Sequence, residues 1–227
     1  DDLYADTRTW LRKGWLDYIA PQIYWNIGNP PADYEKLVHW WAQEVRGRRV
    51  QLYIGQAAYK ITSWQDPNEL PRQLQLNLSL HEIQGSIFFS IKELMANAGN
   101  IRDRLSNDIY KRPVLVPTIS WLGGKAPQAV QLTDAQQKGS GVVLNWRDVT
   151  KSNAAYYAIY RFEGNTVNQQ CQAEHLLTTT RKIGNGEEQT FTDSTTVKGK
   201  TYVYYITALD RLHNESRASQ ELKVTIQ

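Results

Sequence analysis

The segment 14–25 alternates in the way expected of a strand whose two faces differ. Ile19 and Ile23 lie on the face suited to packing against helices, whereas Gln22 and Tyr24 lie on the other face near the end of the segment. Polar and aromatic groups at the carboxyl end of a strand are typical of a (β/α) barrel, where they surround a pocket. We therefore predict a strand that leads into a pocket; the alternative is a half-exposed surface strand.

The apolar pattern over residues 15–110 switches repeatedly between the period of a strand and that of a helix. The predicted order is strand (14–25), helix (33–46), strand (49–59), helix (70–80), strand (84–91) and helix (101–110). Alternation at this spacing predicts parallel strands that are joined by right-handed crossovers.

Capping residues mark where these helices begin. Asp6 or Thr7 can cap a short first helix, and Asp33 can cap the helix that follows the first strand. Asp66 is expected to cap the helix that begins near Leu70, with Glu69 completing a capping box.

The three strands share one arrangement, in which aliphatic side chains face the helices and the opposite face ends in polar or aromatic groups. For the third strand this pattern places Ile87, Phe89 and Ile91 against the helices. It places Phe88 and Ser90 on the pocket side. The repetition favours a pocket at the carboxyl ends of all three strands.

A second pattern begins after residues 113–126, which contain several Pro and Gly residues and read as a linker. Short alternating runs follow, separated by turn signals. They cover residues 129–135, 141–149, 155–162, 176–183, 190–192, 201–209 and 221–226. About seven short strands in about 100 residues predict a β-sandwich over residues 127–227.

Composition narrows the classes of function. The 227 residues carry a formal charge of +3, without a strongly basic half, which argues against nucleic-acid binding. The single cysteine, Cys171, cannot form an internal disulfide, and no Cys/His spacing suggests a metal; we expect no cofactor. No run of 18 apolar residues occurs, so we expect no membrane span. Eight Trp and 13 Tyr suit sugar stacking, but also simple core packing.

Several motifs resemble a known family. They are DLYADT (2–7), GWLDY (14–18), PQIYW (21–25), LYIG (52–55) and GSIFFS (85–90). In this order they are similar to the C-terminal part of the bacterial glycoside-hydrolase-like family once called domain of unknown function 187. Its lipoprotein members cut the glycan strands of peptidoglycan. The resemblance implies a (β/α)8 TIM barrel of which residues 1–112 hold the last three strand–helix units.

The second half resembles a fibronectin type III domain. Trp146 occupies the place of the early core Trp of that fold, and Tyr202 fits the tyrosine corner. The stretches 208–210 and 214–216 fit the end of the penultimate strand and the turn that follows it.

Glycoside hydrolysis ordinarily needs two carboxyl groups across the scissile bond. After the predicted strands, Asp66 is better explained as a helix cap, and Glu93 as part of the first turn of a helix. The resemblance implies that the acidic motif lies on an earlier strand, so no residue of this chain is assigned a catalytic role.

The candidate site is instead a substrate-binding wall. Its predicted residues are Gln22, Tyr24, Trp25, Tyr53, Tyr59, Lys60 and Ser90. The Gln amide can hydrogen-bond sugar hydroxyls, the aromatic rings can stack on sugars, and the Lys ammonium can meet an acidic substituent. For each residue the alternative is packing or exposure to solvent.

Two hypotheses of function follow. The first is the C-terminal segment of a glycoside hydrolase that acts on bacterial glycan, such as peptidoglycan strands, and is inactive by itself. The second is a non-catalytic carbohydrate-binding or adhesive module. Expected partners are a glycan and either the missing earlier part of the barrel or a second copy of the chain. The expected location is periplasmic or cell-surface, with a lipid anchor on an absent N-terminus.

Overall fold

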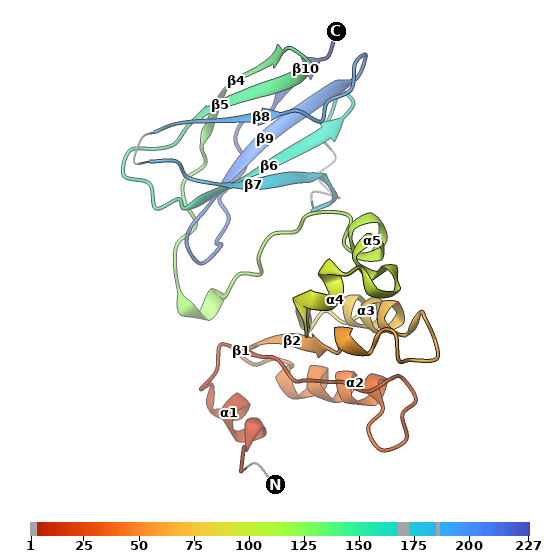
Figure 1. Cartoon of the computed structure of the whole chain (residues 1–227). Helices are drawn as coiled ribbons and strands as arrows, with labels where there is room; N and C mark the ends of the chain where they lie inside the picture. Colours follow the sequence, from red (N-terminus) through yellow and green to blue (C-terminus); the bar gives the residue numbers. More distant parts are fainter. Residues whose placement is uncertain (1–3, 168–172, 185–186) are drawn as a thin grey trace. The chain divides into compact units, whose positions relative to one another are not determined.

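The computed structural model describes residues 4–167, 173–184 and 187–227. The chain divides into two compact units, Asp1–Lys111 and Arg112–Gln227, and each is described by itself (Figure 1). Cys171 and the predicted Asn185–Gly186 turn lie outside the described residues.

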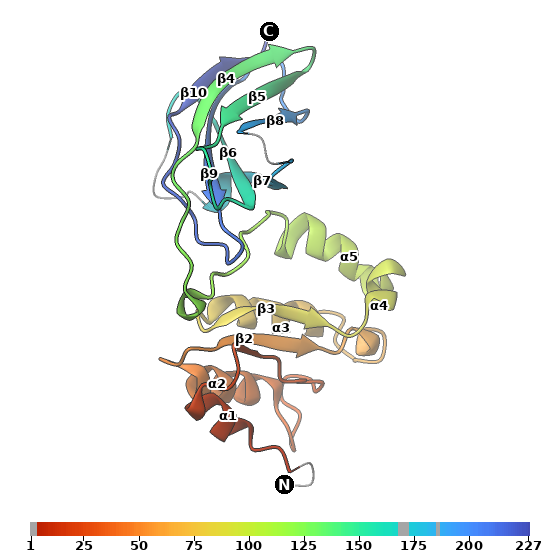
Figure 2. The same ribbon diagram turned by 90° about the vertical axis from the view of Figure 1, so that its left-hand side faces the viewer.

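The first unit contains a three-stranded parallel sheet in the order β1-β2-β3. Its strands are β1 (Tyr18–Ile19), β2 (Gln51–Gln56) and β3 (Ile83–Phe88), and its α-helices are α1 (Thr7–Lys13), α2 (Tyr34–Val45), α3 (Glu69–Ser79), α4 (Ile91–Met95) and α5 (Ile101–Arg104). Shorter helical turns are η1 (Ala58–Lys60), η2 (Ala98–Asn100) and the π-helical η3 (Leu105–Ile109). The predicted alternation of parallel strands and helices is therefore present (Figure 2).

Helices α2 and α3 pack on one face of this sheet. Leu52 and Ile54 of β2 are fully buried in a cluster with Tyr34 and Val38 of α2. The Tyr34 hydroxyl donates to Asn77 Oδ1 of α3 at 3.0 Å, which joins the two helices. The predicted faces of the first two strands are confirmed, since Ile19 and Ile23 also join this cluster.

The third strand presents the face opposite to the one predicted. Phe88 packs against the apolar cluster around Leu70 and Leu74, whereas Ile87 and Phe89 are exposed. The cause is an irregularity in the β2–β3 register, where Leu52 pairs with Ile83 but Tyr53 pairs with Gly85. One extra residue in a strand moves every later side chain to the other face.

The start of α3 also differs from the prediction. Asn68 is its N-cap without a side-chain hydrogen bond, and Asp66, two residues before the N-cap, accepts from Asn68 N at 2.8 Å. Glu69 is buried and forms no capping box. The capping box lies instead at α4, between Ser90 and Glu93. Asp33 does cap α2 as predicted, by accepting from Glu35 N at 3.0 Å.

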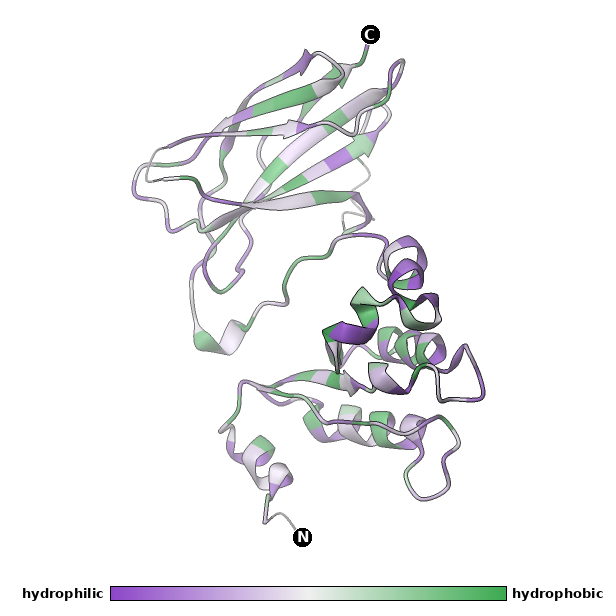
Figure 3. Ribbon diagram, in the orientation of Figure 1, coloured by the Kyte–Doolittle hydropathy of each residue, from purple (hydrophilic) through white to green (hydrophobic). Residues whose placement is uncertain are grey.

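The second unit is the predicted β-sandwich. Its strands are β4 (Gln131–Lys138), β5 (Gly141–Arg147), β6 (Tyr156–Glu163), β7 (Leu176–Arg181), β8 (Glu188–Asp193), β9 (Thr201–Leu209) and β10 (Leu222–Thr225). They form one sheet in the order β4-β5-β8 and another in the order β10-β9-β6-β7. Green apolar positions recur along the central strands of the sandwich in Figure 3.

The landmarks expected of a fibronectin-like core are present. Trp146 is buried and meets the Tyr157 ring edge-on at 5.2 Å. The Tyr202 hydroxyl accepts from Val197 N at 3.1 Å, which is the tyrosine-corner contact.

Residues 112–126 belong to the second unit. Leu115 packs on the outer face of the four-stranded sheet, and Arg112 pairs with Glu174 at 2.8 Å. Asn153 Nδ2 donates to Lys125 O at 2.7 Å. The segment is therefore part of the second unit, where it covers apolar surface of the sandwich.

Candidate functional site

Three aromatic rings meet where the three parallel strands end. Tyr24 follows β1, Tyr59 follows β2 and Phe89 follows β3. The Tyr24 ring centroid lies 5.8 Å from that of Tyr59 and 6.3 Å from that of Phe89, and the Tyr59 and Phe89 centroids are 6.1 Å apart. Tyr59 is 45% and Phe89 59% exposed, so this aromatic cluster offers flat apolar surface to solvent.

A cation lies beside the aromatic cluster. The Lys60 ammonium donates to Tyr24 O at 2.7 Å and lies 5.7 Å from the Tyr59 ring centroid. This hydrogen bond ties the segment after β1 to the segment after β2. The ammonium group carries two further N–H bonds, which leaves it able to bind an acidic or hydroxyl substituent of a ligand.

Buried groups of α3 hold the segment that carries Tyr24. Glu69 Oε1 accepts from Ile27 N at 2.7 Å and from Gln73 Nε2 at 2.7 Å. Gln73 Nε2 also contacts Trp25 O at 3.1 Å. Both side chains are almost completely buried, so these hydrogen bonds lie out of competition with water and fix the loop firmly.

Gly55 allows the segment before Tyr24 to approach β2 closely. A Cβ added at Gly55 would lie 3.1 Å from Pro21 O and 3.2 Å from Gln22 Cα, both of them backbone atoms. The two backbone segments approach this closely because Gln22 and Gly55 form a parallel β-bridge. Gly55 thereby places the exposed Gln22 side chain at the same end of the sheet as the aromatic cluster.

The predicted wall residues are only partly brought together. Tyr24, Tyr59 and Lys60 are in mutual contact. Tyr53 lies earlier on its strand, where its ring meets that of Tyr18 at 6.0 Å and its hydroxyl donates to Gln51. Trp25 directly follows Tyr24 in the sequence, and its side chain is exposed. The binding role of each of these residues stays a prediction.

Ser90 has a structural contact of its own. Its hydroxyl donates to Glu93 Oε2 at 3.0 Å, and its N–H donates to the same oxygen at 3.1 Å. The hydrogen bond from Ser90 N is the main reason that the pKa of Glu93 is lowered. Similarly, the hydrogen bond from Asn68 N holds the pKa of Asp66 below its ordinary value. These two acids are therefore ionised hydrogen-bond acceptors, which is unlike a general acid with a raised pKa.

Burial raises the pKa of Tyr24, and the neighbouring Tyr59 adds to the effect. The phenol consequently stays neutral at physiological pH and can both donate and accept hydrogen bonds. A neutral phenol in an aromatic cluster suits a ligand that is rich in hydroxyl groups.

Two contributors were missed by sequence reasoning. Phe89 was expected among the helices, and only the shifted register of β3 brings it to the aromatic cluster. Glu69 was expected in a capping box, whereas its partner Ile27 lies 42 residues away in the chain. The aromatic character of the end of β3 was the signal that could have drawn attention to Phe89.

Within the described ranges, no three or more His, Cys, Asp or Glu side chains come together in a way that could hold a metal ion. The described helices also include none that is long and apolar enough to cross a membrane.

Comparison with known proteins defines the class of each unit. Residues 1–70 match the family model described as glycosyl hydrolase-like 10. Residues 130–227 match a model described as a fibronectin type III domain, SaeA third domain. The resemblances inferred from the motifs are therefore confirmed for both halves of the chain.

Two relatives of the chain are also described as glycosyl hydrolases. The chain is 48% identical over 229 residues to "Glycosyl hydrolase YngK" of Bacillus subtilis (strain 168), a match that covers 97% of this chain and 43% of that protein. It is 46% identical over 99 residues to "Glycosyl hydrolase DigH" of Escherichia coli (strain K12), covering 39% of this chain and 23% of that protein. The chain thus spans less than half the length of these relatives.

Among solved structures, a beta-1,2-glucanase from Parabacteroides distasonis matches with a TM-score of 0.36 and 27% identity, over 45% of this chain and 13% of that one. A likeness of this size adds nothing to the assignment. The chain is related to glycoside-hydrolase-like proteins by the sequence of its first unit, and its second unit is a fibronectin-like sandwich.

Proposed function

We propose that the first unit forms part of the glycan-binding wall of a glycoside hydrolase. The observation that carries the proposal is the meeting of Tyr24, Tyr59 and Phe89 beside Lys60 at the carboxyl ends of three parallel strands. Open parallel sheets and barrels bind their ligands at this end. Exposed rings can stack on the apolar faces of sugars, while the ammonium and Gln22 supply polar contacts.

The finer form of the proposal is that the three strands belong to a (β/α)8 barrel. A closed barrel of this type needs eight strands, and the chain corresponds to 43% of the YngK relative. The remaining strands and the acid–base pair would then come from a part of the protein outside this chain. On this view the chain by itself binds glycan but does not cleave it.

The substrate is proposed from the same sequence resemblance. Peptidoglycan strands combine sugar rings with acidic substituents, and an aromatic cluster beside an ammonium group suits both features. Such a substrate places the protein in the cell envelope, and a fibronectin-like module is compatible with that location. A lipid anchor outside this chain would hold the protein there.

A non-catalytic carbohydrate-binding module is the second candidate. It is favoured by the state of the acids around the site, since Asp66, Glu69 and Glu93 each accept hydrogen bonds from neighbouring backbone N–H groups. Carboxylates whose oxygens accept backbone hydrogen bonds in this way stabilise the fold. If the longer protein binds peptidoglycan strands but never cleaves them, this second candidate is the correct one.

Binding by the 227-residue chain tests the shared part of both candidates. Isothermal titration with soluble peptidoglycan strands should give a dissociation constant that rises about tenfold, or about 1.4 kcal/mol, in the double variant Tyr59→Ala/Phe89→Ala. Both side chains are substantially exposed, so the melting temperature should change little. Tyr18→Ala is the matched control, because Tyr18 is also exposed but lies at the other end of the sheet. Unchanged affinity in the double variant would refute the proposed wall.

A further inference from the structure

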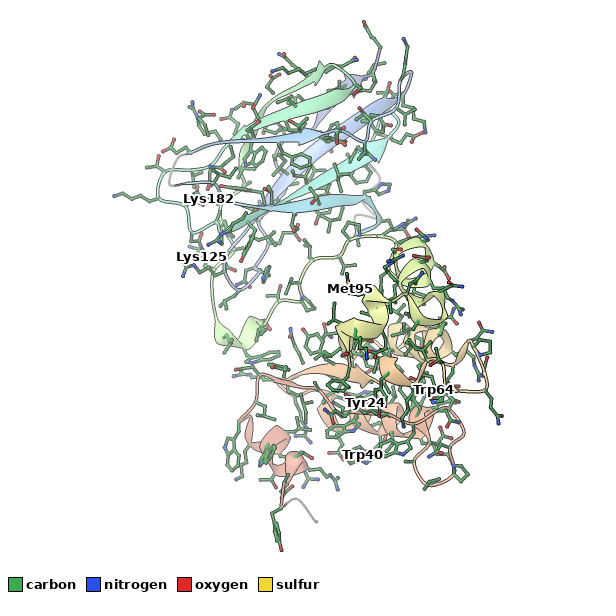
Figure 4. The ribbon with its side chains drawn as sticks, viewed as in Figure 1. Tyr24, Trp40, Trp64, Met95, Lys125 and Lys182 are labelled. Carbon is green, nitrogen blue, oxygen red and sulfur yellow. The ribbon has the colours of Figure 1, made fainter. Side chains whose placement is uncertain are left out.

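The second unit contains a large pocket at one end of the sandwich, of about 1240 Å³. It lies between the β5–β6 loop, the end of β7 and the segment that follows β9 (Figure 4, where Lys182 is labelled). Its lining includes Lys151, Tyr156, Arg181, Lys182, Asp210 and Arg211. Loops that gather at one end of such a sandwich are the usual place for ligand binding in this architecture.

Cations outnumber acids in the pocket, and the acids are already engaged. Glu187 accepts from Thr150 Oγ1 at 2.5 Å. Asp210 accepts from the backbone N–H groups of Leu212 and Asn214, at 2.8 Å each. Among the described residues, neither carboxylate forms an ion pair with a cation of the pocket, and both accept hydrogen bonds from uncharged donors instead.

Three of the four cations are free to bind a ligand. Lys182 is not one of them, because its ammonium donates to the buried carboxylate of Asp148 at 2.6 Å. The side chains of Lys151, Arg181 and Arg211 are exposed, and none of these side chains has a hydrogen-bond or ion-pair partner within the described part of the chain. A guanidinium fork binds carboxylate or phosphate groups in a bidentate manner, which favours an anionic ligand.

An aromatic surface lies directly beside one of these guanidinium groups. Tyr156 and Arg181 are paired residues on the adjacent antiparallel strands β6 and β7, so their side chains are neighbours on one face. The Tyr156 ring stacks on that of His213 with centroids 5.3 Å apart and planes 15° apart. Both rings are half-buried, and the part of the stack that remains accessible next to the cation can contact a sugar ring while the cation binds its carboxylate.

We infer that this end of the sandwich is a binding site for an acidic polysaccharide, with carboxylates held by Arg181 and Arg211 and sugar rings packed beside Tyr156. The site lies in the second unit and does not depend on glycan binding by the first. It gives the fibronectin-like module a role in attachment to an acidic polymer.

Titration of the 227-residue chain with polygalacturonate tests the inference. Methyl-esterified polygalacturonate is the matched ligand, because it keeps the sugar rings and removes the negative charges. We expect binding of the acid form to be at least tenfold tighter than that of the ester. The double variant Arg181→Gln/Arg211→Gln should weaken binding of the acid form at least tenfold.

Matched controls separate a specific site from general charge attraction. Arg12→Gln/Arg49→Gln removes two exposed positive charges from the first unit and should change the affinity less than twofold. Polyphosphate carries charge without sugar rings and should bind more weakly than polygalacturonate. The inference is overturned if the ester binds as tightly as the acid, if the two double variants lose affinity equally, or if polyphosphate binds more tightly. An unchanged melting temperature shows that each variant is folded.

Discussion

The sheets of the two units differ in how completely their faces are covered. In the sandwich, β9 is buried on both faces, because one face meets the three-stranded sheet and the other is covered by residues such as Leu115. In the first unit, α2 and α3 cover one face of the sheet, whereas Tyr18, Ile87 and Phe89 on the other face are exposed. The sandwich therefore completes its own core, while the parallel sheet leaves a large apolar surface open.

This difference bears on what each unit needs in order to be stable. Parallel sheets occur almost only with both faces covered, whereas antiparallel sandwiches bury their inner faces against each other. The exposed face and edges of the first unit are consistent with the proposed barrel, in which further strands would cover them. The same exposure leaves the aromatic cluster accessible to a ligand.

The largest expected effect comes from separating the two units. Residues 112–227 alone should be monomeric and should unfold in one cooperative thermal transition, because their core is complete. Residues 1–111 alone should associate or fail to fold, because about 25 cal/mol is lost for each Å² of apolar surface left in water. Light scattering and thermal unfolding measure both outcomes. A monodisperse monomer of the whole 26.1 kDa chain, without a partner, would contradict our account of the exposed face.

A pair of tryptophans tests the same contrast at single sites. Trp146→Ala in the sandwich should lower the free energy of unfolding by about 3–5 kcal/mol, because the side chain is only 1% exposed. Trp15→Ala in the first unit should change it by less than about 0.5 kcal/mol, because that side chain is 65% exposed. Urea unfolding followed by far-UV circular dichroism measures both. Equal losses would show that the two units are buried to a similar degree in solution.

The smallest expected effect concerns acid stability. Asp193 is buried and accepts from Thr195 Oγ1 at 2.7 Å and Thr195 N at 2.9 Å. It also accepts from Tyr204 Oη and Arg161 Nη1, at 2.8 Å each. Burial raises its pKa, but these hydrogen bonds outweigh burial and lower it below 3.8. Since the pKa is lower in the folded state, its contribution is complete above pH 3.8 and is lost as the pH falls below that value.

Asp193→Asn should therefore lower stability by about 1–3 kcal/mol at pH 7 and flatten its dependence on pH in the acid range. The control is Asp66→Asn in the first unit, whose carboxylate also has a lowered pKa but lies at the surface. It should leave the pH dependence of sandwich unfolding unchanged. If Asp193→Asn leaves the acid limb of the stability curve unaltered, the hydrogen bonds to its carboxylate do not stabilise the folded state.

The sequence alone determined most of the secondary structure and the class of both units. Local periodicity is enough for this, because a buried face repeats every 3.6 residues in a helix and every two in a strand. The buried face of β2 was predicted correctly for this reason, whereas the tyrosine corner at Tyr202 was predicted from the resemblance to a fibronectin type III domain. Tyr24, Tyr59 and Lys60 were also predicted as neighbours of one pocket, since parallel strands end at one edge of a sheet.

Only the tertiary structure decided which face β3 presents and what Glu69 binds. The face of β3 depends on a register shift against β2, and no residue pattern within β3 reports the pairing of another strand. Glu69 carries the local signature of a capping box, but its side chain is buried and accepts instead from the backbone N–H of Ile27, where water competes little for the hydrogen bond. Both outcomes arise from contacts between segments distant in the chain, and local periodicity carries no information about such contacts.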